Sequence, residues 1–200
     1  MSVTVVVRRH ARERQEEALV TAVAAAIAPP HLRASAQAWL FQGLDDPRAV
    51  LAVTRWTDRQ EYRAHNGASP RAIEALCDAP PQHAFYQQLD LIEAPTIPAA
   101  VLSCVIVQAP PAATAAVITY LFERSGPALL AAPGLALRAI YQDMDVPSRL
   151  FTLLGWRTPA DQEAARRFLA PLLDPPLRDL GATIERFRDR TPAEADRARG

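Results

Sequence analysis

The sequence contains no lysine, so all 22 of its basic residues are arginine. P-loop phosphate binding, lysine Schiff bases and pyridoxal chemistry each need a lysine amine, and these kinds of site are therefore excluded. Glycine is also scarce, with seven residues and no G-x-G-x-x-G cluster. This scarcity argues against a Rossmann dinucleotide site, which needs glycines where the backbone approaches the pyrophosphate.

Cysteine and histidine are few and scattered. The two cysteines, Cys77 and Cys104, lie in different apolar segments, which is typical of small core residues. The four histidines show neither H-x-x-x-H nor H-E-x-x-H spacing. We therefore expect no metal site, the alternative being one that folding assembles from separate segments.

Excess charge and long apolar runs are absent as well. Twenty-two acidic residues balance the 22 arginines, and a chain without net positive charge is not expected to bind nucleic acid. The apolar run Val3–Val7 is too short and too early for a signal peptide, and no run approaches the length of a membrane span. We expect a cytoplasmic protein with reduced thiols and no membrane partner.

What the sequence does contain is an internal repeat. Four residues recur at an offset of one hundred: Gln42 with Gln142, Asp45 with Asp145, Pro47 with Pro147 and Trp56 with Trp156. One extra residue then enters, so that Pro70 matches Pro171. The repeat predicts two similar domains, residues 1–95 and 96–190, followed by a frayed tail at 191–200.

Both units are predicted to have the element order β-α-β-β-α-β. In the first we expect strands at 3–8, 35–42, 48–56 and 83–92, a helix at 11–28, a short helix capped by Thr57 and Gln60, and another beginning at Ser69-Pro70. In the second we expect strands at 101–108, 135–142, 149–156 and 182–188, a helix at 111–132 kinked at Gly126-Pro127, a helix capped by Thr158, and another opened by Pro171.

This order is that of the ferredoxin-like split βαβ arrangement, an α+β fold. Helices would cover one face of each antiparallel sheet, yet the first strand has apolar residues on both faces, with Val5 and Val7 on one and Val6 on the other. The simplest way to bury the second face is against the sheet of the other unit. We therefore predict two tandem ferredoxin-like domains whose sheets pair into a barrel within one chain.

The segment LAVTRWTDRQEYRAH at 51–65, followed by Ser69-Pro70, resembles the antibiotic biosynthesis monooxygenase domain. The shared pattern is an apolar strand ending in Trp, a polar cap, an aromatic residue, a His and then Ser-Pro. The second unit keeps the strand, Trp156 and the proline but loses much of the rest. As a tandem fusion of two such domains, the resemblance spans nearly the whole chain and implies the fold of the dimeric α+β barrel superfamily.

The resemblance also implies a chemistry. Family members that oxidise aromatic anthrones to quinones do so without metal or flavin, using a Trp at the strand end, a Tyr six residues later and an Asn four residues before the Trp. Trp56 and Tyr62 match the first two, whereas Ala52 stands in place of the Asn. In the second unit Trp156 remains and Thr152 stands at the Asn position. Haem-degrading members need an Asn on the first strand and a His after Ser-Pro, and this sequence matches neither.

Tyr62 and His65 are the candidate catalytic residues. They lie three apart on one short helix and so share a face, where a phenol and an imidazole could orient a substrate and move a proton. The same face could equally lie in solvent, where neither residue would act. Arg8 and Arg9 are expected to end the first strand at the surface.

Six aromatic residues are candidates for contacting a flat substrate: Trp39, Phe41, Trp56, Phe85, Tyr86 and Trp156. We expect Trp39, Phe41 and Trp56 to share one sheet face. Phe85 and Tyr86 are neighbours on a strand and point to opposite faces, so only one of them can reach a given cavity. An aromatic core cluster would explain the same residues, and Trp56 and Trp156 are expected to pack between sheet and helices.

The leading hypothesis is a cofactor-independent monooxygenase. It would deprotonate an electron-rich aromatic or polyketide-like compound to a carbanion or phenolate, which reacts directly with dioxygen. Trp56 and Tyr62 would position the substrate, and His65 would take the proton. One alternative is a non-catalytic small-molecule-binding or stress-associated protein, which Ala52 favours. Another is a cyclase or isomerase, which would convert its substrate identically with and without oxygen. Whether the chain forms a homodimer stays open, because the fusion could satisfy the need for a partner domain.

Overall fold

A computed structural model of the protein describes residues 2–27, 38–65, 70–93 and 99–191. The chain forms two compact units, one of Met1–Gln87 with Phe187–Gly200 (unit 1) and one of Gln88–Arg186 (unit 2). The division is based on contacts in space. Strands β4 (Gln82–Glu93) and β8 (Thr183–Asp189) each have one part in unit 1 and the other part in unit 2. The domain boundary at residue 95 follows the sequence repeat and stays a prediction.

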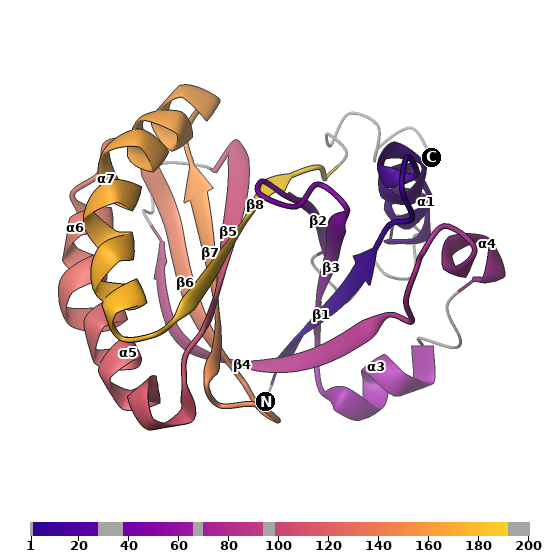
Figure 1. The fold of residues 1–200 in the computed structure, drawn as a ribbon, viewed down its shortest axis with the longest axis horizontal. Helices are drawn as coiled ribbons and strands as arrows, with labels where there is room; N and C mark the ends of the chain where they lie inside the picture. Colours follow the sequence, from indigo (N-terminus) through magenta and orange to yellow (C-terminus); the bar gives the residue numbers. More distant parts are fainter. Residues whose placement is uncertain (1, 28–37, 66–69, 94–98, 192–200) are drawn as a thin grey trace. The chain divides into compact units, whose positions relative to one another are not determined.

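Unit 1 is an antiparallel sheet with helices beside it (Figure 1). Its strands are β1 (Val3–His10), β2 (Ala38–Gly43), β3 (Ala49–Trp56) and the first half of β4, in the order β4-β1-β3-β2, and the end of β8 pairs with β2. Its helices are α1 (Glu16–Ile27), α3 (Arg59–His65) and α4 (Arg71–Glu74). The order β-α-β-β-α-β is the predicted one.

The alternation of β1 divides its side chains between two faces. Val5 and Val7 belong to the core cluster that also holds Leu19 of α1 and Tyr62 of α3, so they lie on the helix side of the sheet. Val6 is equally buried but is not part of that cluster. The sequence prediction that β1 is apolar on both faces is confirmed.

The β2–β3 connection is held by the same hydrogen bond that recurs in the second unit. Gln42 Nε2 donates to the carbonyl of Pro47 over 2.9 Å. Gln142 Nε2 donates to the carbonyl of Pro147, also over 2.9 Å. The glutamine and proline of the sequence repeat therefore have one structural role, which is to close the turn of each hairpin.

Unit 2 has strands β5 (Val101–Gln108), β6 (Leu135–Asp143), β7 (Arg149–Trp156) and the first part of β8, in the order β8-β5-β7-β6, with the second half of β4 beside β6. A helical run lies between β5 and β6: a 3₁₀ turn (Pro111–Ala113), α5 (Thr114–Tyr120), a π-helical turn (Leu121–Ser125) and α6 (Gly126–Leu130). The irregularity expected at Gly126-Pro127 is thus a π turn directly before Gly126. Helix α7 (Pro159–Asp179) covers the sheet beside α5 and α6 (Figure 1).

The prediction of two helices between β7 and β8 is wrong. Helix α7 begins with the predicted Thr158 cap, whose hydroxyl accepts from the amide of Asp161, and continues through Pro171. Four residues at a spacing of four pack against the unit's core along its whole length: Ala165, Leu169, Leu173 and Leu177. This burial outweighs the hydrogen bond that Pro171 removes.

Two helix starts in unit 1 also differ from the prediction. Helix α1 begins at Glu16 rather than near residue 11, because Arg14 is in the left-handed region at φ 64°. Helix α3 is capped one residue later than expected: the Asp58 carboxylate accepts from the amide of Glu61 over 2.8 Å, and Glu61 accepts from the amide of Thr57 over 2.8 Å. A reciprocal cap is present, with Asp58 and Glu61 in place of Thr57 and Gln60.

Other predicted segments agree with the strands within a few residues, and the α+β class with antiparallel strands is confirmed. Three predicted parts lie outside the described residues: the start of β2 at residues 35–37, Ser69 at the beginning of the second short helix, and residues 192–200 of the tail.

Candidate functional site

Tyr62 is the one buried residue of α3, with 5% of its surface exposed. The reciprocal cap of Asp58 and Glu61 fixes where α3 begins and therefore which side chain of this seven-residue helix points to the sheet. Burial raises the pKa of the Tyr62 phenol, and the charge of Arg9 offsets part of that rise. Tyr62 is consequently a neutral hydrogen-bond donor at neutral pH.

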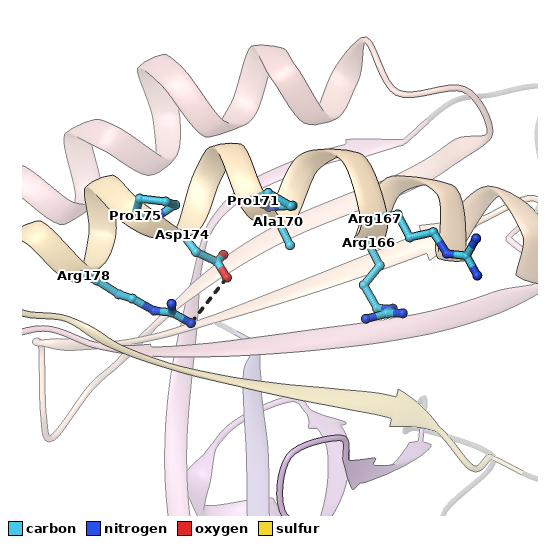
Figure 2. Close-up of a pocket in the computed structure, with 7 residues that line it drawn as sticks. All are labelled: Arg166, Arg167, Ala170, Pro171, Asp174, Pro175 and Arg178. Carbon is cyan, nitrogen blue, oxygen red and sulfur yellow. Dashed lines mark ion pairs between the residues drawn. The ribbon is translucent and has the colours of Figure 1, made fainter.

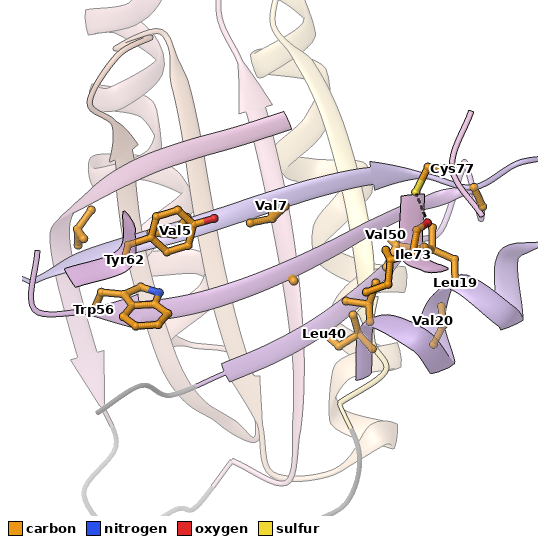
Figure 3. Close-up of a cluster of buried hydrophobic side chains, with 14 residues drawn as sticks. Val5, Val7, Leu19, Val20, Leu40, Val50, Trp56, Tyr62, Ile73 and Cys77 are labelled. Atoms are coloured by element: carbon orange, nitrogen blue, oxygen red, sulfur yellow. Dashed lines mark hydrogen bonds between the residues drawn. The ribbon is translucent and has the colours of Figure 1, made fainter. Parts of the chain in front are cut away.

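Trp56 ends β3 and forms one wall beside Tyr62. Its ring is 2% exposed, and the two ring centroids lie 5.6 Å apart in an edge-to-face arrangement. The indole Nε1 donates to Thr54 Oγ1 over 2.8 Å, so its polar group is satisfied within the strand. Figure 3 shows Trp56 and Tyr62 next to each other at one end of the cluster, with Ile73 and Cys77 at the other.

The Tyr62 hydroxyl meets His83 of β4. Tyr62 Oη and His83 Nδ1 are 2.6 Å apart, and partial burial, helped by the charge of Arg9, lowers the pKa of His83. A neutral His83 accepts through Nδ1, so the phenol donates and the imidazole proton is on Nε2. His83 as a whole residue is exposed, so its imidazole can exchange protons with water.

Phe85 lies on the same face of β4 as His83. Its ring stands edge-to-face to Tyr62, with centroids 5.6 Å apart, and the guanidinium carbon of Arg59 lies 4.5 Å from its centroid. Of the neighbouring pair Phe85 and Tyr86, Phe85 is therefore the one that reaches Tyr62. Tyr86 is 1% exposed and pairs with Thr4, on the other face of the sheet.

His65 lies at the exposed end of α3. Its Nδ1 is 2.9 Å from the carbonyl oxygen of Glu61, which can only accept, so Nδ1 carries a proton. Its ring centroid is 5.9 Å from that of Trp56. The rings of Tyr62 and His65 thus both lie next to Trp56, but Tyr62 is buried and His65 faces solvent.

The expectation that Trp39, Phe41 and Trp56 share one face is wrong. In the β2–β3 register Trp39 pairs with Val53 and Phe41 with Leu51, whereas Trp56 is on the face of Leu40. Trp39 and Phe41 therefore point away from Tyr62. A residue and its cross-strand partner share a face, and faces alternate along a strand. Trp56 is an odd number of residues from Val53 and Leu51, so it lies on the opposite face.

Trp156 packs within unit 2, against Ala165 of α7 and Leu129 of α6. Its Nε1 donates to Ser103 Oγ over 3.2 Å, much as Trp56 donates to Thr54. The repeated tryptophans thus have the same packing role, but Glu163 and Gln162 stand where unit 1 has Tyr62, and Gln162 donates to the carbonyl of Leu102.

Sequence reasoning missed two members of the site, His83 and Arg9. Strand alternation would have placed His83 with Phe85, and Arg9 with Val5 and Val7, on one face. The expectation that Arg9 ends its strand at the surface is wrong, because its guanidinium is largely buried and its Nε lies out of reach of solvent.

A shallow depression of about 360 Å³ runs along α7 in unit 2 (Figure 2). Three arginines line it, and each has an acidic partner: Arg166 and Arg167 pair with Glu163, and Arg178 pairs with Asp174. Because these arginines already have acidic partners, the depression is a weaker candidate for binding a charged ligand than the site around Tyr62.

Within the described ranges, no group of three or more His, Cys, Asp and Glu side chains is arranged to hold a metal ion. Cys77 and Cys104 are both buried and are in the thiol form. Among the helices of the described ranges, none is long and apolar enough to cross a membrane.

No family model and no curated protein match the sequence. Solved structures match the fold. An anthrone oxidase-like protein superposes with a TM-score of 0.67 at 10% identity, covering 94% of this chain and 91% of its own. A candidate monooxygenase from Fusobacterium nucleatum gives a TM-score of 0.65 at 10% identity, covering 94% and 92%.

A third structure is a ferredoxin-fold protein from Listeria monocytogenes related to antibiotic biosynthesis monooxygenases. It superposes with a TM-score of 0.51 at 10% identity and covers 96% of both chains. At such identities the likeness establishes the α+β fold shared with these proteins, and the fold hosts more than one activity.

Proposed function

We propose that the protein is a cofactor-independent monooxygenase that oxidises an electron-rich aromatic compound with dioxygen, and that unit 1 holds the reacting centre. The observation that carries the proposal is the 2.6 Å contact between Tyr62 Oη and His83 Nδ1 beside the ring of Trp56. The fold shared with an anthrone oxidase-like protein supports it. We also propose that the chain is a tandem fusion of two ferredoxin-like domains whose sheets pair with each other.

The pair can move a proton without forming a buried charge on the phenol. A substrate C–H or O–H proton passes to Tyr62 Oη as the phenolic proton passes to His83 Nδ1. The imidazolium then loses its Nε2 proton to water on the exposed side. This assigns the accepting role to His83, whereas the sequence hypothesis gave it to His65.

The resulting substrate carbanion or phenolate gives electrons to dioxygen and forms a peroxide on the reacting carbon. For a methylene substrate, the O–O bond breaks as the carbon loses its second hydrogen, and the products are a ketone and water. One oxygen atom of dioxygen enters the product and the other leaves as water. The rings of Trp56 and Phe85 would hold the flat substrate against Tyr62.

The test is oxygen uptake by metal-free protein with a panel of anthrones and dihydroxyaromatics. We expect protein-dependent uptake with quinone formation, lowered about 100-fold or more in His83→Gln and little changed in His65→Ala. Uptake no faster than the spontaneous reaction across the panel would refute the proposal. Identical conversion under nitrogen would instead indicate a cyclase or isomerase.

The alternative function, a non-catalytic binding protein, has one observation in its favour. Ala52 is 4% exposed and packed in the same core cluster as Trp56 and Tyr62. The anthrone oxidisers that the sequence resembles have an Asn at this position. Alanine has no side-chain amide, so Ala52 cannot supply the hydrogen bonds of that Asn. Binding of the panel compounds without any conversion would support this alternative.

Light scattering tests the assembly. A mass near the chain's 21.9 kDa would show that the protein acts as a monomer, and a doubled mass would show a homodimer.

A further inference from the structure

We propose that this site takes an aromatic carboxylate, and that Arg9 is the residue that binds the carboxylate group. The inference rests on the proposed function, because it deepens the same site and names its substrate class. It is carried by a largely buried guanidinium that lacks a compensating charge among the described residues.

Arg9 is placed on the helix side of the sheet by the alternation of β1. Its cross-strand partner is Val50, which belongs to the same core cluster as Val5, Val7 and Tyr62. The side chain therefore extends from the strand toward the layer that holds Tyr62. Its charge is close enough to influence both Tyr62 and His83.

The Nε atom of Arg9 is buried and has no hydrogen-bond partner among the described residues. Arg12 and Arg48, whose side chains lie near the same end of the sheet, differ. Arg12 Nε donates to the carbonyl of Cys77 over 2.9 Å, and Arg48 Nε donates to the carbonyl of Ala11 over 2.8 Å. Because buried donors in folded proteins nearly always have partners, the unpaired Nε of Arg9 points to an acceptor that a ligand supplies.

The titratable groups around Arg9 supply no negative charge. Burial raises the pKa of the Cys77 thiol and of the Tyr62 phenol, and partial burial lowers the pKa of His83. All three are therefore neutral near pH 7. Burial likewise lowers the pKa of Arg9 itself, but an arginine stays protonated at neutral pH.

Two acidic residues at this end of unit 1, Asp46 and Asp78, have partners other than Arg9. Asp78 accepts from His10 and pairs with Arg48, and Asp46 lies 3.0 Å from the other ring nitrogen of His10. Neither carboxylate forms an ion pair with Arg9. A cation that burial deprives of water, without a carboxylate beside it, is stabilised when a ligand brings one.

Two further features favour an aromatic acid as the ligand of this site. The rings of Trp56, Tyr62 and Phe85 stand together, so the group attached to the carboxylate would meet ring faces and edges. The guanidinium of Arg59 over Phe85 adds a second positive charge at the same wall. A guanidinium fork also matches the two oxygens of a carboxylate better than it matches a single oxygen.

The experiment compares binding of 2-naphthoate with binding of its neutral isostere 2-naphthamide, and with 2-naphthol, by titration calorimetry at pH 7. All titrations are run under nitrogen, so binding is measured whether or not the protein consumes oxygen. The wild-type protein is expected to bind naphthoate at least tenfold more tightly than naphthamide. Naphthol, uncharged at this pH, is expected to bind as the amide does.

The variant arm uses Arg9→Met and Arg9→Lys, with Arg63→Met as the control. Arg63 is exposed on α3, so its replacement changes the net charge of unit 1 by the same amount. Arg9→Met should abolish the preference for the acid, Arg9→Lys should keep part of it, and Arg63→Met should keep it whole.

Equal affinity of the wild-type protein for acid and amide would overturn the inference, as would millimolar ligand without any binding. An acid preference that survives in Arg9→Met would overturn it too. The wild-type comparison needs no variant to fold. An acid preference that depends on Arg9, in a protein without oxygen uptake, would leave this inference standing and refute only the monooxygenase proposal.

Discussion

Replacing Tyr62 with Phe should separate a structural role of this residue from a chemical one. The substitution keeps a ring that is 5% exposed and edge-to-face with both Trp56 and Phe85, and it removes only the hydroxyl 2.6 Å from His83 Nδ1. The lost hydrogen bond is worth about 1 kcal/mol net. His83 is exposed and can take water in its place, so no buried acceptor is left unpaired.

A loss of about 1 kcal/mol corresponds to a fall in Tm of roughly 2–4 °C for a protein of this size. Tyr62→Ala, by contrast, removes the ring from the aromatic contacts and should cost about 3–5 kcal/mol. The rate of substrate oxidation in Tyr62→Phe should fall about 100-fold or more, because the hydroxyl that relays the proton from the substrate to His83 is gone. Urea unfolding and oxygen uptake measure the two effects on one preparation.

Tyr120→Phe is the matched control. The Tyr120 hydroxyl donates to the carbonyl of Leu173 over 3.1 Å in unit 2, so its loss costs a comparable hydrogen bond far along the chain from Tyr62. We expect a similar fall in stability and an unchanged oxidation rate. Equal rates in Tyr62→Phe and Tyr120→Phe would refute the role assigned to the Tyr62 hydroxyl.

Three other predictions follow from single contacts. The His83 Cε1 proton should titrate by NMR with a pKa lower than that of an exposed histidine, and the oxidation rate should fall as the pH drops through this lowered pKa, where the base becomes protonated. Gly126→Ala should destabilise the protein by roughly 1–3 kcal/mol in urea unfolding, although alanine normally favours a helix, because the new methyl group would lie 3.1 Å from the buried Arg138 guanidinium. The hydrogen bond from His10 lowers the pKa of Asp78. The ionised Asp78 therefore stabilises the fold above about pH 4, and this stabilisation is lost as the pH falls through the folded-state pKa. The urea midpoint of Asp78→Asn should depend less on pH in that range than the midpoint of the wild-type protein.

The strand pattern could be predicted from the sequence because alternation and turn residues act locally. The hairpin around Pro47, and its counterpart around Pro147, follow from the repeated residues and have the same glutamine hydrogen bond. Helix α7 was mispredicted because Pro171 is a local signal, whereas the buried row from Ala165 to Leu177 that keeps the helix continuous is a tertiary effect.

The site was only half predictable for a similar reason. Tyr62 lies six residues after Trp56 on the next element of the chain, and their proximity follows from this short connection. The grouping of Trp39 with Trp56 failed because strand register decides the face, and a shift of one residue reverses it. His83 reaches Tyr62 only through the pairing of β4 with β1, which nothing near either residue in the sequence specifies.

Substrate binding and proton transfer should be coupled through Arg9. The charge of Arg9 is one of the two causes that lower the pKa of His83, after partial burial. A carboxylate bound to Arg9 would neutralise that charge, so the pKa of His83 should rise on binding and the imidazole should become a stronger base when substrate is present. NMR titration should show the rise with 2-naphthoate and not with 2-naphthamide, and Arg9→Met should raise the pKa of His83 without any ligand. A His83 pKa that is the same in the Arg9→Met variant and in the wild-type protein would show that the two groups act independently.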